Sequence, residues 1–228
     1  RGASRNQILE QMSAAHTKAL DEIWAGRDKD LPFAEPKQLV TLASIVEKET
    51  GKADERPHVA SVFLNRLDRN MRLQSDPTII YGLVGGAGTL GRPISRADID
   101  KPTPYNTYHV NGLPPGPIAN PGRAALEAVA NPSNTKDLYF VADGTGGHIF
   151  AASLAEHNRN VAKWRKIERE KAAAGKADVD TKDPDAIDLP PDADGEAPEA
   201  KAADPNDLLE GAAPRDPSQP VLPQPKPE

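Results

Sequence analysis

The fold is decided by residues 36–50, PKQLVTLASIVEKET. Apolar residues recur in this stretch at spacings of three and four, which is the period of a helix with one buried face. A proline opens the stretch and a glycine follows it, as is common at the two ends of a helix. The sequence therefore predicts an amphipathic helix whose apolar stripe finishes in a glutamate: Leu39, Leu42, Val46 and Glu49.

Glu49 is the candidate for chemistry on this helix. Glu47 lies about 200° away around the helix axis, so it should have different neighbours. Partial burial and the negative end of the helix dipole would both raise the pKa of Glu49. A carboxyl that stays partly protonated near neutral pH can act as a general acid. From the pattern alone, an ordinary glutamate at a frayed helix end is the simpler interpretation.

The composition divides the chain near residue 172. All ten aromatic residues fall between Trp24 and Trp164, whereas residues 173–228 hold 11 of the 23 prolines and few large apolar side chains. That segment cannot bury enough surface to offset the entropy of ordering, so we expect a disordered acidic tail. Residues 1–172 carry a net charge of +3 and the tail −9. A nearly neutral folded part argues against nucleic acid as a partner, since nucleic-acid binding usually needs a concentrated basic face.

The remaining patterns predict a mainly helical α+β domain over residues 1–172. The segment 71–121 is rich in Gly and Pro and shows no long periodicity, but it holds enough apolar side chains to pack, so we expect ordered loops that face a substrate. A glycine-rich turn, DGTGG at 143–147, predicts a β-hairpin. The other helices are expected at 4–25, 54–69, 122–130 and 153–172, and the hairpin strands at 138–142 and 148–152.

Six blocks of sequence in a fixed order resemble one family. They are LASIVEKET (42–50), VASVFLNRL (59–67), MRLQSDPT (71–78), YNTY (105–108), GLPPGPI (112–118) and YFVADG (139–144). Together they resemble the MltG (YceG-like) family of endolytic murein transglycosylases over about residues 1–170. The pair Glu49-Thr50 also resembles the Glu-Ser pair on the active-site helix of lysozyme-like transglycosylases.

The resemblance implies that Glu49 is the catalytic residue of a peptidoglycan lytic transglycosylase. Such an enzyme cleaves the bond between N-acetylmuramic acid and N-acetylglucosamine without water, leaves 1,6-anhydromuramyl ends, and limits the length of nascent glycan strands. The family needs no cofactor, works beside peptidoglycan synthases such as penicillin-binding proteins, and is anchored on the periplasmic face of the inner membrane. The chain begins with Arg1 and has no run of ~18 apolar residues, so we expect a soluble fragment without the anchor.

Two other interpretations stay open. Asp76 could be the second carboxylate of a lysozyme-type hydrolase, or it could help to hold the substrate, although an aspartate before a proline also favours a turn. The domain could instead be a glycan-binding module without catalysis.

Six further residues are candidates for substrate binding. Tyr105 and Tyr108 could stack on sugars or pack in the core. Asn65, Gln74 and Asn106 could bond N-acetyl and hydroxyl groups or brace loops. Arg66 could meet a lactyl or peptide carboxylate or form a structural ion pair. The five histidines lack a metal-ligand spacing, so the sequence predicts neither a metal nor a cofactor; they are His16, His58, His109, His148 and His157.

Overall fold

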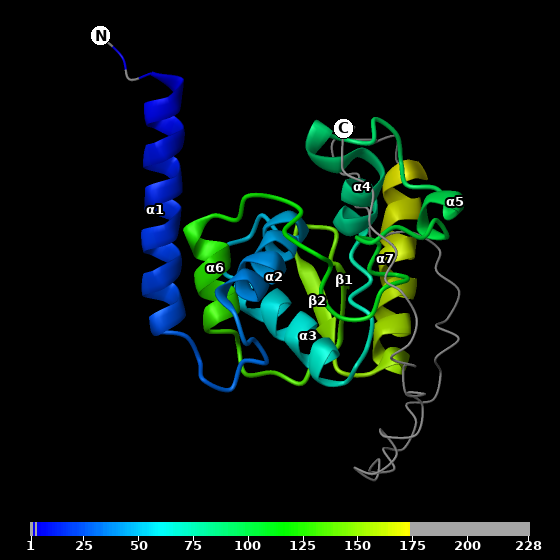
Figure 1. The fold of residues 1–228 in the computed structure, drawn as a ribbon. Helices are drawn as coiled ribbons and strands as arrows, with labels where there is room; N and C mark the ends of the chain where they lie inside the picture. The colour runs from blue at the N-terminus through cyan, green and yellow to red at the C-terminus, as the bar shows by residue number, and fades with distance from the viewer. Residues whose placement is uncertain (1, 3, 174–228) are drawn as a thin grey trace, which may run out of the picture. The chain divides into compact units, whose positions relative to one another are not determined.

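The central feature of the computed structural model is the helix α2 (Pro36–Glu49), which packs between the helices α3 (Arg56–Asp68) and α6 (Arg123–Ala130). The structure describes residue 2 and residues 4–173. The described residues form seven α-helices and one two-stranded sheet (Figure 1), which confirms the expected α+β, mostly helical class. The other elements are α1 (Arg5–Ala25), α4 (Asp76–Val84), a 3-10 helix η1 (Gly85–Ala87), α5 (Arg96–Ile99), β1 (Tyr139–Ala142), β2 (His148–Ala151) and α7 (Leu154–Ala173).

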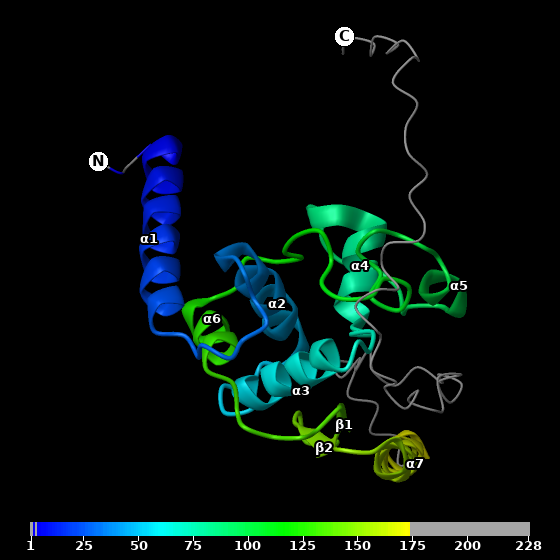
Figure 2. The ribbon, with the colours of Figure 1, turned by 60° about the horizontal axis from the view of Figure 1, so that its bottom comes forward.

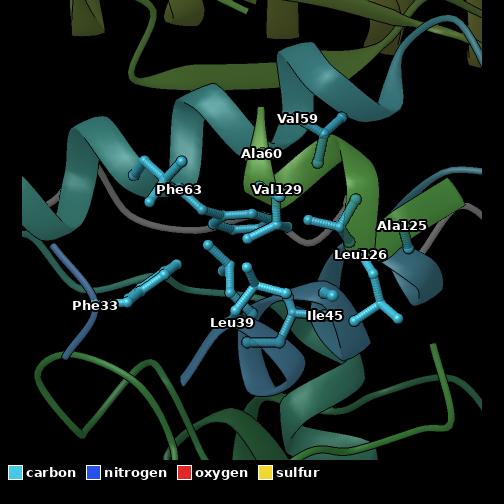
Figure 3. Packing of buried hydrophobic residues seen from close by; sticks show 14 of the residues in the cluster. Phe33, Leu39, Ile45, Val59, Ala60, Phe63, Ala125, Leu126 and Val129 are labelled. Carbon is cyan, nitrogen blue, oxygen red and sulfur yellow. The ribbon is translucent and has the colours of Figure 1, made fainter. Parts of the chain in front are cut away.

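One hydrophobic core holds these three helices together (Figure 3). The inward positions of α2 are fully buried, and they meet side chains of α3 and α6 in the close-up view. Burial of each large apolar side chain contributes on the order of 1.5–3 kcal/mol, so this contact fixes the orientation of α2. The labelled members of the core are Phe33, Leu39, Ile45, Val59, Ala60, Phe63, Ala125, Leu126 and Val129.

The predicted hairpin and last helix are both confirmed. β1 and β2 pair antiparallel, with Phe140 opposite Phe150, and α7 packs against both strands (Figure 2). Gly144 and Gly146 have φ of 82° and 89°, a backbone conformation that favours glycine. The carboxylate of Asp143 accepts hydrogen bonds from the backbone N–H of Thr145 and of Gly147, which closes the turn.

α1 departs from the expected pattern of burial. The helix is present, but residues 4–18 are exposed and its contact with α6 lies nearer its C-terminal end (Figures 1 and 2). Ile8, Met12 and Ile23 lie on one stripe at three- and four-residue spacing, for which burial is the expectation from the sequence. Ile23 is buried, but Ile8 and Met12 are 46% and 61% exposed. The periodicity predicted the helix correctly but not what covers it.

The segment 71–121 is ordered, but the expectation that it is all irregular was wrong. It contains α4, η1 and α5. Four of the nine residues of α4 are buried and the other five are half-buried. A helix without an exposed face lacks the alternation that reveals an amphipathic helix. Leu73, Ile79, Ile99 and Ile118 are buried, so the segment packs as part of the domain. The acidic tail expected over 173–228 lies outside the described residues, apart from Ala173 at the end of α7.

Candidate active site

Glu49 is the last residue of α2 and is half-buried. Thr50 ends the helix by turning to an extended conformation, with φ −135° and ψ 133°, in place of the expected glycine cap. Seven residues of α2 are buried, so the position of Glu49 is set by a helix that the core holds in place. Partial burial and the C-terminal end of a helix, the two conditions expected of a catalytic acid at this position, are both present.

Glu49 and Glu47 have separate surroundings, as the helical period predicts. Oε1 of Glu49 accepts a hydrogen bond from the hydroxyl of Ser75. Oε2 of Glu47 instead accepts the backbone N–H of Gly122 at 3.0 Å, at the N-terminus of α6. Glu47 therefore binds the backbone of the residue before α6, while Glu49 faces the segment that leads into α4.

Ser75 was missed as a site residue in the sequence. It is 2% exposed and immediately precedes α4. Its backbone N–H donates to Oγ1 of Thr107 at 2.9 Å, and its carbonyl accepts from Oγ1 of Thr78 at 2.5 Å. The two threonine hydroxyls are themselves 2.9 Å apart. No short-range pattern links Ser75 to Glu49, because 26 residues separate them.

The Glu-Thr pair does not supply the hydroxyl at Glu49. Oγ1 of Thr50 donates to Oε2 of Glu55 at 3.4 Å and accepts the N–H of Lys52 at 3.1 Å. Glu55 also lies 2.8 Å from Nδ1 of His148 on β2. Thr50 therefore ties the loop after α2 to the hairpin, and Ser75 provides the hydroxyl that reaches the candidate acid.

Asp76 is the first residue of α4 and is fully buried, with 0% of its surface exposed. The hydroxyl of Tyr108 donates to its Oδ1 at 2.7 Å. Asp76 is thus adjacent to the site in sequence, through Ser75, but its carboxylate is covered. Tyr108 is half-buried and connects the loop 105–108 to α4.

Arg66 lies beneath the segment that carries Ser75. The side chain is 8% exposed; Nε donates to the carbonyl of Leu138 at 2.6 Å, and Nη1 donates to Oε1 of Gln74 at 2.9 Å. Nη1 also lies within hydrogen-bond distance of the carbonyls of Arg72 and Leu73, at 2.9 and 3.3 Å. These bonds connect α3 to Leu138, the residue before β1, and to residues 72–74, so Arg66 acts as a clamp between these segments.

The other residues predicted to bind substrate are distributed around this clamp. The amide nitrogen of Asn65 donates to the carbonyls of Thr135 and Asp137. Asn106 is 1% exposed, and its amide bonds the carbonyls of Ile99 and Lys101 as well as the N–H of Tyr108. Both asparagines therefore brace loops, the alternative that the sequence left open.

Gln74 and Tyr105 are half-buried. The backbone of Gln74 has φ of 51°, an uncommon conformation for a residue other than glycine. The ring of Tyr105 packs edge-on against Tyr81, with 4.7 Å between ring centroids. The structure thus brings Glu49, Gln74, Asp76 and Tyr108 together around Ser75, while Asn65, Arg66 and Asn106 form hydrogen bonds to neighbouring loops.

Within residues 4–173, no group of three His, Asp or Glu side chains is arranged to hold a metal ion. In the same part of the chain, no helix combines the length and the apolar composition needed to span a bilayer.

The fold and site define a mostly helical α+β domain with a half-buried glutamate at the end of its central helix. The chain belongs to the YceG-like family, whose sequence profile matches residues 1–163. It is 41% identical over 134 residues to an endolytic murein transglycosylase of Bacillus subtilis, covering 59% of this chain and 36% of the relative. It is 40% identical over 163 residues to an endolytic murein transglycosylase of Streptococcus pneumoniae, covering 68% of this chain and 28% of the relative.

A solved structure gives the same result. The chain is similar to the crystal structure of a yceG-like protein from Listeria monocytogenes, with a TM-score of 0.59 and 37% identity, over 69% of this chain and 50% of that one. The chain spans about a third of the length of the curated relatives it matches.

Proposed function

We propose that residues 1–172 form the catalytic domain of an endolytic murein transglycosylase and that Glu49 is its catalytic acid and base. The observation that carries this is the contrast between two carboxylates. Glu49 is half-buried at a helix end and accepts a hydroxyl hydrogen bond, whereas Asp76 is 0% exposed and bonded to Tyr108. The names of the relatives from Bacillus subtilis and Streptococcus pneumoniae support the same activity.

A single carboxyl can perform both proton transfers of this reaction. Glu49 donates its proton to the glycosidic oxygen as the bond from that oxygen to the anomeric carbon of N-acetylmuramic acid breaks. The resulting carboxylate takes the proton of the muramyl 6-hydroxyl while that oxygen bonds to the anomeric carbon. The proton returns to Glu49 and no water is consumed, so the product end is a 1,6-anhydro sugar. The nucleophile belongs to the substrate, so no second carboxylate is required.

The burial of Asp76 disfavours the hydrolase alternative. A two-carboxylate glycosidase needs a second group that reaches either a water molecule or the anomeric carbon. Asp76 exposes none of its surface and is held by Tyr108. A binding module without catalysis would not require an acid at Glu49. Lytic activity of the wild-type chain and of Glu49→Gln therefore distinguishes a binding module from an enzyme.

The decisive experiment is analysis of digestion products in heavy-oxygen water. We expect the chain to release muropeptides with anhydro ends that are lighter than hydrolysed ends by one water and carry no label. Glu49→Gln should lower the rate by about a hundredfold or more, since it removes the general acid. Glu47→Gln is the matched control and should retain activity, because the amide oxygen can still accept the N–H of Gly122.

Each alternative has its own outcome in this experiment. Labelled reducing ends would establish a hydrolase, and loss of activity in Asp76→Asn without loss of folding would then assign the second carboxylate. Binding of glycan strands without cleavage by the wild-type chain would establish a binding module. Unchanged lytic activity in Glu49→Gln would remove Glu49 from the mechanism.

We further propose peptidoglycan strands as the substrate and half-buried side chains of residue 74 and the loop 105–108 as their contacts. Gln74, Tyr105 and Tyr108 keep part of their surface accessible, and the face of a tyrosine ring suits the C–H face of a sugar. The family resemblance also implies a site of action on the periplasmic face of the inner membrane and a peptidoglycan synthase as partner. Cell fractionation and co-purification with the parent protein test these two points.

A further inference from the structure

We propose that Ser75 is a positioning residue for Glu49 and that the loop 72–75 is built to present its hydroxyl to the acid. This rests on the proposed function of Glu49. The contact itself is a hydrogen bond from Oγ of Ser75 to Oε1 of Glu49, and it joins the start of α4 to the end of α2.

The hydroxyl of Ser75 is not used for the purpose that its place in the helix suggests. Ser75 occupies the N-cap of α4, where a serine side chain usually accepts a hydrogen bond from the second or third N–H of the helix. In this helix the side chain makes no capping bond, and the N–H of Thr78 is bonded to the carbonyl of Ser75. The hydroxyl of Ser75, which could cap α4, instead donates a hydrogen bond to Glu49.

The backbone of Ser75 is held at both its N–H and its carbonyl. Thr107 accepts the N–H of Ser75, and Thr78 donates to its carbonyl. Thr78 and Thr107 are each 0% exposed, so water does not compete for these bonds. The orientation of Ser75 is therefore fixed by the protein before any substrate arrives.

The preceding residue supplies a second observation. Gln74 has φ of 51°, and such a conformation persists only where the surroundings over-determine it. Its N–H donates to the carbonyl of Thr107 at 3.2 Å, and Arg66 donates to its side-chain oxygen. The strained residue turns the chain directly before Ser75, and strain of this kind clusters at functional sites.

The expected consequence concerns both protonation states of Glu49. A hydroxyl that donates to the carboxylate stabilises the charged form, so it favours release of the proton in the acid step, and it restricts rotation of the carboxyl in both steps. In Ser75→Ala the charged form loses this stabilisation. The midpoint of the titration of Glu49 should then move upward by about one pH unit. Turnover should fall by tenfold to about a hundredfold from lost orientation, with KM unchanged.

The test is carbon NMR of the 228-residue chain labelled at its glutamate carboxyls. The signal of Glu49 is assigned by its absence in Glu49→Gln, and its titration is compared in wild type, Ser75→Ala and Ser61→Ala. Ser61 is the matched control, because it is also buried, at 3% exposed, and its hydroxyl has a different partner. The hydroxyl oxygens of Ser61 and Thr135 are 2.8 Å apart. Ser75→Cys keeps the volume with a weaker donor, and it replaces the alanine variant if that does not fold.

The outcomes separate this proposal from the proposed function. An upward shift in the Ser75 variants with none in Ser61→Ala supports the positioning role. An unchanged midpoint in a folded Ser75 variant, or an equal shift in Ser61→Ala, overturns it. Reducing ends from the wild-type chain would refute the transglycosylase activity, while the titration would still decide whether Ser75 acts on Glu49.

Discussion

Arg66 offers the sharpest prediction about how the site is supported. Its side chain reaches the carbonyls of Leu138 and Leu73, both in buried residues, and the side-chain oxygen of Gln74. Arg66→Ala removes these donors together with the buried stem of the side chain. We therefore expect a large loss of stability, and loss of substrate affinity alone would not fit this geometry.

The magnitude follows from the groups that lose a donor. A buried carbonyl without a partner costs about 1–3 kcal/mol, and two of the three carbonyls in reach of Arg66 belong to buried residues. The guanidinium also lies 5.1 Å from the centroid of the Tyr139 ring, a contact worth roughly 0.5–1 kcal/mol. The free energy of unfolding should fall by about 3–5 kcal/mol, out of a total on the order of 5–15 kcal/mol.

Urea unfolding of the 228-residue chain measures this loss. Arg66→Met keeps most of the apolar stem, so it should still lose at least about 2 kcal/mol. Arg72→Ala is the control: its side chain is exposed, and its effect should stay within about 0.5 kcal/mol. If Arg66→Ala is as stable as wild type and only raises KM, Arg66 binds a substrate carboxylate and the clamp is refuted.

Two more outcomes are expected from buried acidic groups. Tyr108→Phe removes the donor to the fully buried Asp76 and should lower the free energy of unfolding by about 1.5–3 kcal/mol in urea titrations; no loss would mean that the bond is not formed in solution. Asp98 has its pKa lowered, first by the side-chain hydrogen bond from Arg92. Its contribution to stability is therefore present above the ordinary aspartate value of 3.8 and is lost as the pH falls below it. The destabilisation caused by Asp98→Asn should shrink between pH 7 and about pH 3, whereas Asp100→Asn, in a pair with both side chains more than half exposed, is the control for the loss of an exposed carboxylate.

Much of the fold could be predicted from local patterns. α2, α3, α6, the hairpin and α7 all lie within a few residues of their predicted bounds. α4 was missed because none of its residues is fully exposed, so the segment carries no helical alternation. The exposure of Ile8 and Met12 on α1 could not be predicted, because periodicity shows which residues share a face but not what packs against it.

The candidate site, like the fold, was only partly predictable from the sequence. Helical spacing separated Glu49 from Glu47, and the structure gives the two carboxylates different partners. The spacing could not reveal that Ser75, and not the adjacent Thr50, faces Glu49. Nor could it show that Asn65 and Asn106 bond backbone carbonyls, since those partners lie five to 72 residues away in sequence.

The sequence by itself determined the central helix, the stripe that ends in Glu49 and the family to which the six ordered blocks belong. These follow from properties of neighbouring residues, which a helix repeats every three or four positions. The tertiary structure alone decided that Ser75 reaches Glu49 and that Asp76 is buried beneath Tyr108. Both depend on packing that brings distant segments together, because the hydrogen bonds of a buried polar group are set by its neighbours in space.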